Sequence, residues 1–246
     1  MRVTRVFVDA PLTAGATMSL PEGPAGHLLR VLRLGVGDAC VLFNGDGFDY
    51  PARIVAAGKR DASVVLDAPR APGNESPLRI VLLQAVARGE KMDWIVQKTT
   101  ELGVDGIVPV LSERSEVKLD GQRADKRIAH WRSVAAAACE QSGRARLPSI
   151  ESPQSLPEAL RSLPQSDCCL MLQPDADASA LSGLTLAADA RVTVAIGPEG
   201  GWSARDLQQL AEAGFRGLRL GPRVLRTETA GIAVIAALQA RFGDFC

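Results

Sequence analysis

Alternating hydrophobic and polar positions dominate the first seventy residues and predict short β-strands. Turn residues bound these runs, and Asn44-Gly45-Asp46-Gly47 is a strong signal for a hairpin turn. Apolar residues recur at helical spacing over residues 26–34, which predicts a short helix between strands. The expected strands are residues 5–8, 39–43, 48–55 and 63–66. The pattern predicts a small β-barrel.

A stretch without periodicity follows at residues 68–77. It reads A-P-R-A-P-G-N-E-S-P, a proline-rich composition typical of a linker between folding units. We therefore expect two domains, residues 1–72 and residues 73–246.

Strand patterns alternate with helical patterns after the linker. The expected strands are residues 79–86, 106–111, 168–172, 191–196 and 217–220, and the expected helices are 91–102, 125–141, 157–162, 204–213 and 228–242. Gly103 stands where a left-handed residue ends a helix, and Ser203 with Asp206 forms a capping box for another. The alternation predicts an α/β domain with a mostly parallel sheet covered by helices.

Charge and cysteine content narrow the function classes. Lys and Arg total 28, as do Asp and Glu, so the overall basicity of many nucleic-acid binders is missing and any RNA contact is local. The five cysteines show no C-x-x-C spacing, so we expect neither a disulfide framework nor a metal site. The N-terminus lacks a signal-peptide core and no apolar run approaches the ~20 residues that span a bilayer. We expect a cytoplasmic protein without membrane contact.

The segment I-G-P-E-G-G-W-S at residues 196–203 directly follows a predicted buried strand. Strand ends of open α/β sheets are common ligand positions, and glycine lets a ligand approach the main chain. The spacing G-x-x-G-G is not the dinucleotide fingerprint G-x-G-x-x-G, which disfavours a nicotinamide-dependent oxidoreductase, and no phosphate-loop lysine is present. Taken alone, the segment fits a tight turn without a ligand equally well.

A second break follows the strand pattern at 217–220. Gly221 and Pro222 interrupt the chain before a helix of small residues, and Thr227 or Thr229 stands where a side chain caps that helix. We expect the two loops to come from neighbouring strands and to close over one ligand. The charges of Arg226 and Glu228 beside this break favour a site over a solvated surface.

The two segments resemble the signatures of the RsmE family of 16S ribosomal RNA uridine-N3 methyltransferases. They are I-G-P-E-G-G at 196–201 and L-G-P-R-V-L-R-T-E-T-A at 220–230, with supporting matches at residues 27–33, 91–103, 113–115 and 140–144, in order along nearly the whole chain. The resemblance implies a PUA-like RNA-binding barrel, a SPOUT methyltransferase domain with a C-terminal trefoil knot, a homodimer, and S-adenosylmethionine bound in the knot.

The resemblance also implies the cofactor contacts. The matching positions are Leu172, Gly197, Pro198, Glu199, Gly200, Gly201, Leu220, Gly221, Val224, Leu225, Arg226, Thr227, Thr229 and Ala230. The substitution Gly200→Val is expected to abolish cofactor binding. Residues 173–174 are Gln-Pro, whereas many relatives have histidine or glutamate before this proline. The difference puts in doubt only a role of the residue 173 side chain, because the contact expected there is with the backbone.

The chemistry of a uridine target suggests catalytic residues. Neutral N3 carries a proton, so methyl transfer requires deprotonation and is helped by stabilising the charge that develops on the flanking carbonyl oxygens. For that charge we favour Arg226, with Arg114 and Arg144 as alternatives. For the proton we favour Glu228 or Glu140, while loss to solvent, or a purely structural role for Arg226 and Glu228, stays open.

The expected RNA partner is 16S ribosomal RNA or the small-subunit particle. The candidate phosphate-binding cations are Arg5, Arg30, Arg33, Arg88, Lys91 and Lys98. His27, His130 and Cys139 are expected to be surface or packing residues. Two alternatives remain open: another SPOUT methylation, at ribose 2′-O or guanine N1, and a non-catalytic RNA-binding assembly factor.

Overall fold

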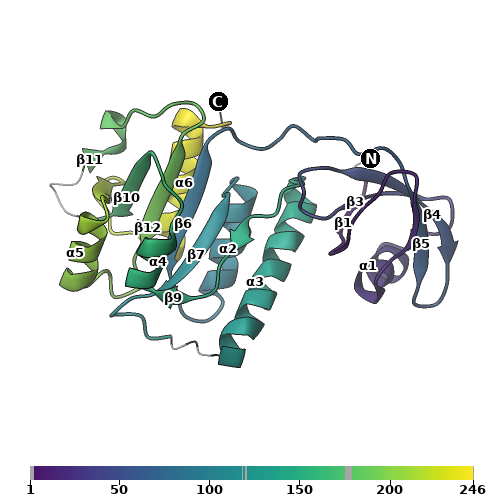
Figure 1. The fold of residues 1–246 in the computed structure, drawn as a ribbon, viewed down its shortest axis with the longest axis horizontal. Helices are drawn as coiled ribbons and strands as arrows, with labels where there is room; N and C mark the ends of the chain where they lie inside the picture. The colour runs from purple at the N-terminus through teal and green to yellow at the C-terminus, as the bar shows by residue number, and fades with distance from the viewer. Residues whose placement is uncertain (1–2, 118, 120, 175–178, 246) are drawn as a thin grey trace. The chain divides into compact units, whose positions relative to one another are not determined.

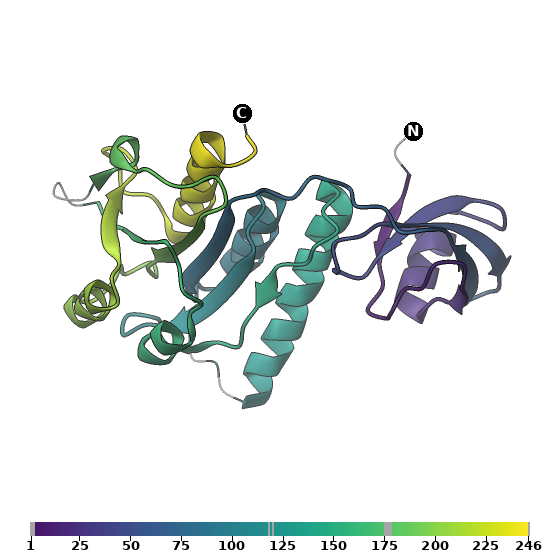
Figure 2. The same ribbon diagram turned by 45° about the horizontal axis from the view of Figure 1, so that its top comes forward.

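The computed structural model describes the chain except for residues 1–2, 118, 120, 175–178 and 246. The chain forms two compact units (Figures 1 and 2). One comprises Met1–Glu75 and Ala136–Leu147, and the other comprises Ser76–Ala135 and Pro148–Cys246. The first unit therefore includes a segment that lies far along the chain from residue 75.

The first unit is built on a five-stranded sheet. Its strands are β1 (Arg5–Phe7), β2 (Thr17–Ser19), β3 (Ala39–Phe43), β4 (Tyr50–Ala57) and β5 (Ala62–Leu66). They pair in the order β1-β3-β4-β5-β2, antiparallel except for β1 with β3. The sequence pattern missed β2, which is only three residues long and mostly exposed, so it carries no hydrophobic alternation.

Two local predictions in this unit are confirmed. The turn after β3 contains Gly45 at φ 91° and Gly47 at φ 100°, the left-handed conformations that glycine adopts readily, and it joins β3 to the antiparallel β4. A helical segment interrupts the strands as expected. It consists of α1 (Glu22–Gly26), which runs directly into a π-helical turn at His27–Val31.

The second unit is an α/β domain with an eight-stranded parallel sheet. Its strands are β6 (Arg79–Ala85), β7 (Gly106–Leu111), β8 (Ser149–Ile150), β9 (Gln154–Ser155), β10 (Cys168–Leu172), β11 (Ser179–Ala180), β12 (Arg191–Ile196) and β13 (Arg216–Arg219). The order is β11-β13-β10-β12-β6-β7-β8, and β9 also pairs with β7. The predicted parallel sheet is confirmed.

Helices cover both faces of this sheet (Figure 1). They are α2 (Lys91–Glu101), α3 (Gly121–Ser142), α4 (Leu156–Ser162), α5 (Ala204–Glu212) and α6 (Thr227–Phe242), with a 3-10 turn at Leu181–Gly183. In β6, Leu82 packs with the residues of α2 and α6, while Leu83 packs with those of α4 and α5. The central strands are buried on both sides, which explains their continuous apolar sequences.

The predicted helix ends are confirmed as well. Gly103, at φ 85°, follows the end of α2. Ser203 Oγ accepts a hydrogen bond from the Asp206 backbone N–H at 3.0 Å, and the Asp206 carboxylate accepts from the Ser203 N–H at 3.0 Å. This reciprocal capping box fixes the start of α5. Among the described residues, no helix is long and apolar enough to cross a membrane.

The strand order corrects one expectation. The strands that precede the two glycine-containing loops, β12 and β13, are not neighbours, because β10 lies between them. Since all three strands are parallel, their carboxyl ends meet at one edge of the sheet. The carboxyl end of β10 therefore lies between the two loops, at the same edge of the sheet.

Candidate active site

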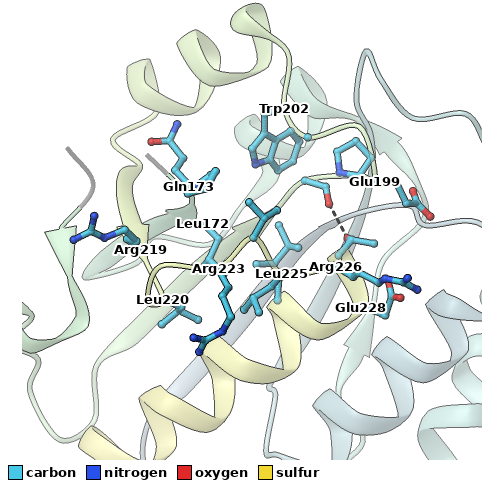
Figure 3. Close-up of a pocket in the computed structure, with 18 of the residues that line it drawn as sticks. Leu172, Gln173, Glu199, Trp202, Arg219, Leu220, Arg223, Leu225, Arg226 and Glu228 are labelled. Atoms are coloured by element: carbon cyan, nitrogen blue, oxygen red, sulfur yellow. Dashed lines mark hydrogen bonds between the residues drawn. The ribbon is translucent and has the colours of Figure 1, made fainter. Parts of the chain in front are cut away.

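A cavity of about 520 Å³ opens at the carboxyl ends of β10, β12 and β13 (Figure 3). It is lined by three chain segments, one from each strand end, together with Lys91 of α2 and Leu207 of α5. The segments contribute Leu172, Gln173, Pro174, Ile196, Gly197, Pro198, Glu199, Gly201, Trp202, Arg219, Leu220, Gly221, Arg223, Val224, Leu225, Arg226, Thr227, Glu228 and Ala230. All of these residues belong to the second unit.

The structure brings nearly all of the expected cofactor residues together. Only Gly200 and Thr229 of that set do not line the cavity, and both are exposed. A Cβ atom at Gly200 would meet only the Arg114 side chain, at an ordinary contact distance of 3.5 Å. The protein itself therefore leaves room for a side chain at Gly200, and the expected loss of cofactor binding in Gly200→Val stays a prediction.

Gly197 is the tightly confined glycine of this turn. A Cβ atom there would lie 3.2 Å from the Trp202 backbone nitrogen and 3.4 Å from Cδ1 of its indole. The first of these distances is tighter than most side chains tolerate, so the turn would have to shift. Gly201, at φ 69°, and Gly221, at φ 73°, instead hold left-handed backbone in the two loops.

Thr227 ties the two loops to the sheet. Its hydroxyl donates to the Gly197 carbonyl oxygen at 2.7 Å and accepts from Gln84 Nε2 at 3.0 Å (Figure 3 shows the first bond). Gln84 is fully buried in β6 and also donates to the Ala85 carbonyl oxygen. The expectation that Thr227 caps α6 is wrong, because no side chain bonds at the Arg226 N-cap and the hydroxyl is used across the site.

Charged groups gather at one side of the cavity. Lys91 Nζ lies 2.9 Å from Glu199 Oε1 and 3.9 Å from Glu228 Oε2. Burial would raise the pKa of the Glu199 carboxyl, but hydrogen bonds from Lys91 and from the backbone N–H groups of Glu199 and Arg88 outweigh it and leave this pKa below its ordinary value. Lys91 is part of the cavity wall, and its expected contact with RNA stays a prediction.

Arg226 and Glu228 both line the cavity, yet they do not pair with each other. The Arg226 guanidinium is exposed and has no hydrogen bond or ion pair within the described part of the chain. Glu228 Oε2 is buried and has no hydrogen-bond partner. Both groups are therefore available to a ligand, which weakens the purely structural explanation of the pair.

The other three expected catalytic residues lie outside the cavity. Arg114 borders the glycine turn, where its Nη1 donates to the Gly200 carbonyl oxygen at 2.9 Å. Glu140 and Arg144 are part of the first unit, where Glu140 accepts from the Phe7 backbone N–H at 2.9 Å. Arg144 is 4% exposed and forms an ion pair with Glu75 at 2.7 Å. These contacts give Glu140 and Arg144 structural roles in the first unit, and their expected part in the chemistry stays a prediction.

Arg5 also departs from its expected RNA-binding role. Its side chain is 8% exposed and pairs with Asp49, donates to the Arg144 carbonyl oxygen at 2.8 Å, and lies over the Phe43 ring. A cation with these partners braces the first unit and is not available to phosphates.

The remaining expected RNA contacts lie at the surface. Arg30 and Arg33 are exposed, and Arg33 is the non-glycine residue with positive φ among the described residues, at 59°. Arg88 is exposed beside Glu116, and Lys98 lies 2.9 Å from Glu101. Their contact with RNA stays a prediction.

The histidine and cysteine expectations agree with the structure. His130 is exposed and its Nε2 lies 2.8 Å from the Asp93 carboxylate. Burial raises the pKa of the Cys139 thiol to about 12, so it stays protonated at neutral pH and acts as a packing residue. Within the described ranges, no group of three or more His, Cys, Asp and Glu side chains could hold a metal ion.

Trp202 and Gln84 are among the site residues that sequence reasoning missed. Trp202 lines the cavity and directly follows the glycines of the first signature, so its position along the chain was an available signal. Gln84 reaches Thr227 from 143 residues away, and only the pairing of β6 with β12 brings the two together.

Comparisons with known proteins agree with this arrangement. Residues 74–239 match the family model described as an RNA methyltransferase domain, and residues 25–67 match the RNA methyltransferase PUA domain. Ribosomal RNA small subunit methyltransferase E of Buchnera aphidicola is 30% identical, with 99% of this chain and 98% of the relative covered. The chain belongs to the RsmE family.

Solved structures similar to this RsmE family member contain the family's cofactor. The RsmE of Neisseria gonorrhoeae bound to S-adenosylmethionine is 38% identical, covers 100% of both chains and superposes with a TM-score of 0.91. A Legionella pneumophila protein in complex with bound S-adenosylmethionine is 35% identical, covers 99% of this chain and 100% of its own, and has a TM-score of 0.93.

Proposed function

We propose that the protein transfers a methyl group from S-adenosylmethionine to N3 of a uridine in 16S ribosomal RNA. The observation that carries this proposal is that both signature segments of the RsmE family line one cavity, at the carboxyl ends of parallel strands. Two relatives of the same fold are bound to S-adenosylmethionine. Uridine N3 as the target atom comes from the family.

The residues of the cavity fit this cofactor. Its volume lies within the range of small-molecule sites, roughly 300–1,000 Å³. Leu172, Leu220 and Leu225 supply an apolar wall for a purine, and the left-handed glycines Gly201 and Gly221 leave backbone accessible. When bound, S-adenosylmethionine supplies a methyl group on a positively charged sulfur.

We assign the chemical roles to Arg226 and Glu228, which both line the cavity and do not pair with each other. Glu228 Oε2 accepts the N3 proton, directly or through solvent, and Arg226 donates hydrogen bonds to the carbonyl oxygens that flank N3. The N3 electron pair then forms the N–CH₃ bond while the S–CH₃ bond breaks, and the sulfur keeps that electron pair as a neutral thioether. Arginine suits its role because it stays cationic and offers several donors.

RNA docking is assigned to the first unit, which contains the PUA-like match. Arg30 and Arg33, both exposed, hold phosphates there, and Arg88 and Lys98 of the second unit add further contacts. The substrate is 16S ribosomal RNA or the small-subunit particle, and the reaction takes place in the cytoplasm.

Three further properties belong to the same proposal. The domain boundary lies at residue 73, the C-terminal segment threads a loop to form a trefoil knot, and two copies form a homodimer. The trefoil knot and the homodimer come from the family resemblance. If light scattering showed a monomer at micromolar concentration, the proposed homodimer would be wrong.

Mass spectrometry of ribosomal RNA tests the function. A strain that lacks the gene should contain 16S RNA with one uridine lighter by one methyl group, and the wild-type gene should restore that methyl group. Loss of a ribose 2′-O or guanine methyl group would instead identify another SPOUT reaction. An unchanged RNA would favour a non-catalytic assembly factor.

A further inference from the structure

We infer that the indole N–H of Trp202 donates a hydrogen bond to an acceptor atom in the adenosine part of bound S-adenosylmethionine. The inference rests on the proposed function, because it concerns the same cavity and its cofactor. It adds a polar contact from a side chain to a site whose expected contacts are otherwise mainly glycine-rich backbone.

The Trp202 donor lacks a partner, and the residue that carries it lines the cavity. The residue is 8% exposed and lines the cavity, and its Nε1 atom is buried without a hydrogen bond. A buried donor left unpaired costs about 1–3 kcal/mol, so such groups are rarely left without a partner. Trp131 Nε1 is also unpaired, but Trp131 packs in the apolar cluster that includes Ile150 and does not line the cavity.

The position of the indole is set by its neighbours. A Cβ atom on Gly197 would lie 3.4 Å from Cδ1 of Trp202, the carbon bonded to Nε1, so the pyrrole edge of the indole faces the first residue of the turn. Ser203, the next residue, is held by its capping box with Asp206. Figure 3 shows the indole beside the cavity, with its nitrogen on the side of Leu172 and Gln173. The donor is therefore held in place by the protein's own contacts.

The surroundings of Trp202 indicate which part of the cofactor it meets. Leu172, Gln173 and Leu207 line the cavity with neutral side chains, whereas the charged pair Lys91 and Glu199 lies elsewhere on the wall. The other cations of the wall, Arg219, Arg223 and Arg226, lie at and after the end of β13 and not on the turn that carries Trp202. A carboxylate held against the neutral side chains beside Trp202 would lack a cation, which is costly. Adenosine instead offers neutral ring nitrogens and ribose oxygens as acceptors. The charged methionine end fits the side with Lys91, Glu199 and Glu228.

Calorimetry on Trp202→Phe tests the inference, because phenylalanine keeps an aromatic ring but has no N–H. We expect affinity for S-adenosylmethionine to fall roughly 3- to 10-fold. Affinity for 5′-methylthioadenosine, which has the complete adenosine but no amino-acid end, should fall by the same factor. Trp94→Phe is the matched control, since Trp94 is 60% exposed and outside the cavity, and it should leave both affinities unchanged.

A second measurement does not depend on the variant folding. In the wild-type protein labelled with ¹⁵N-tryptophan, the three indole N–H signals can be followed during titration with 5′-methylthioadenosine. The Trp202 signal should shift downfield as its hydrogen bond forms, and the Trp94 signal should stay in place.

Each other outcome overturns the inference. Equal affinities of Trp202→Phe and wild type, or an unmoved Trp202 signal in the presence of bound ligand, would show that the N–H makes no bond. A loss confined to S-adenosylmethionine would place the acceptor at the methionine end. Failure of the wild-type protein to bind S-adenosylmethionine would instead refute the proposed function, which is a distinguishable result.

Discussion

The hydroxyl of Thr227 donates to the Gly197 carbonyl oxygen at 2.7 Å, which joins the first residue of α6 to the turn that ends β12. The same hydroxyl accepts from the buried Gln84 of β6. One side chain thus links β6, the turn after β12 and the start of α6, although they are widely separated in the sequence.

Thr227→Val, which keeps the shape but removes the hydroxyl, should destabilise the protein by about 1–3 kcal/mol because it leaves buried Gln84 with one partner fewer. S-adenosylmethionine affinity should fall as well, since the two loops are no longer tied. Urea unfolding and calorimetry measure these effects. Thr227→Ser keeps the hydroxyl and should retain most of both properties, so equal losses in the two variants would contradict the role of this hydrogen bond.

The two glycines of the first signature should differ in their tolerance of a methyl group. Gly197→Ala places a Cβ atom 3.2 Å from the Trp202 backbone nitrogen and should weaken S-adenosylmethionine binding about 10-fold or more, on the order of the 1–3 kcal/mol that overpacking costs. Gly200→Ala meets only a flexible arginine at 3.5 Å and should bind nearly as the wild type does. If Gly200→Ala were the more damaging change in calorimetry, the cofactor would approach the turn from a different side.

The ion pair of Lys91 and Glu199 should contribute stability that depends on pH. The pKa of the Glu199 carboxyl is lowered in the folded protein, so the contribution is present above the ordinary carboxyl pKa of 4.5 and is lost as the pH falls through the lowered value. Urea unfolding should therefore show Lys91→Met to be less stable than the wild type at pH 7, with a difference that shrinks in acid. A difference that is independent of pH would show that Lys91 acts through packing alone.

Arg226→Lys should separate binding from chemistry. We expect unchanged S-adenosylmethionine affinity and single-turnover methylation that is ~10- to 1000-fold slower, the range for loss of one preorganised donor. Arg205→Lys, an exposed position on α5 outside the cavity, is the matched control. Rates should also rise with pH if N3 deprotonation limits them. A flat pH profile with an undiminished Arg226→Lys rate would leave the loop as a cofactor scaffold only.

Arg30→Glu and Arg33→Glu should weaken RNA binding without changing S-adenosylmethionine affinity. Phosphate contacts release counterions, so the dependence of RNA affinity on salt should become shallower in these variants. Filter binding at several salt concentrations measures the change. Arg5→Met should instead lower stability, because Arg5 is buried with Asp49. If RNA affinity were unchanged in both glutamate variants, Arg30 and Arg33 would not be part of the RNA-binding surface.

The sequence alone determined the longer strands, the main helices and the two loops, because these depend on local features, whereas it missed the two- and three-residue strands β2, β8, β9 and β11. Hydrophobic periodicity placed β7, β10 and β12 at their observed ends, and the Ser203 capping box and Gly103 marked helix ends. Glycine and proline at strand ends identified the two loops that line the cavity, because irregular backbone is predicted by the residues of the loop itself.

Only the tertiary structure decided which distant residues meet. It inserted β10 between β12 and β13, placed Lys91 in the cavity wall, and placed Glu140 and Arg144 in the first unit. Each outcome depends on partners far along the chain, such as Arg5 and Arg144, which are 139 residues apart. A charged residue has the same local pattern whether it is solvated or buried against a partner, so its role is settled by packing and strand order rather than by periodicity.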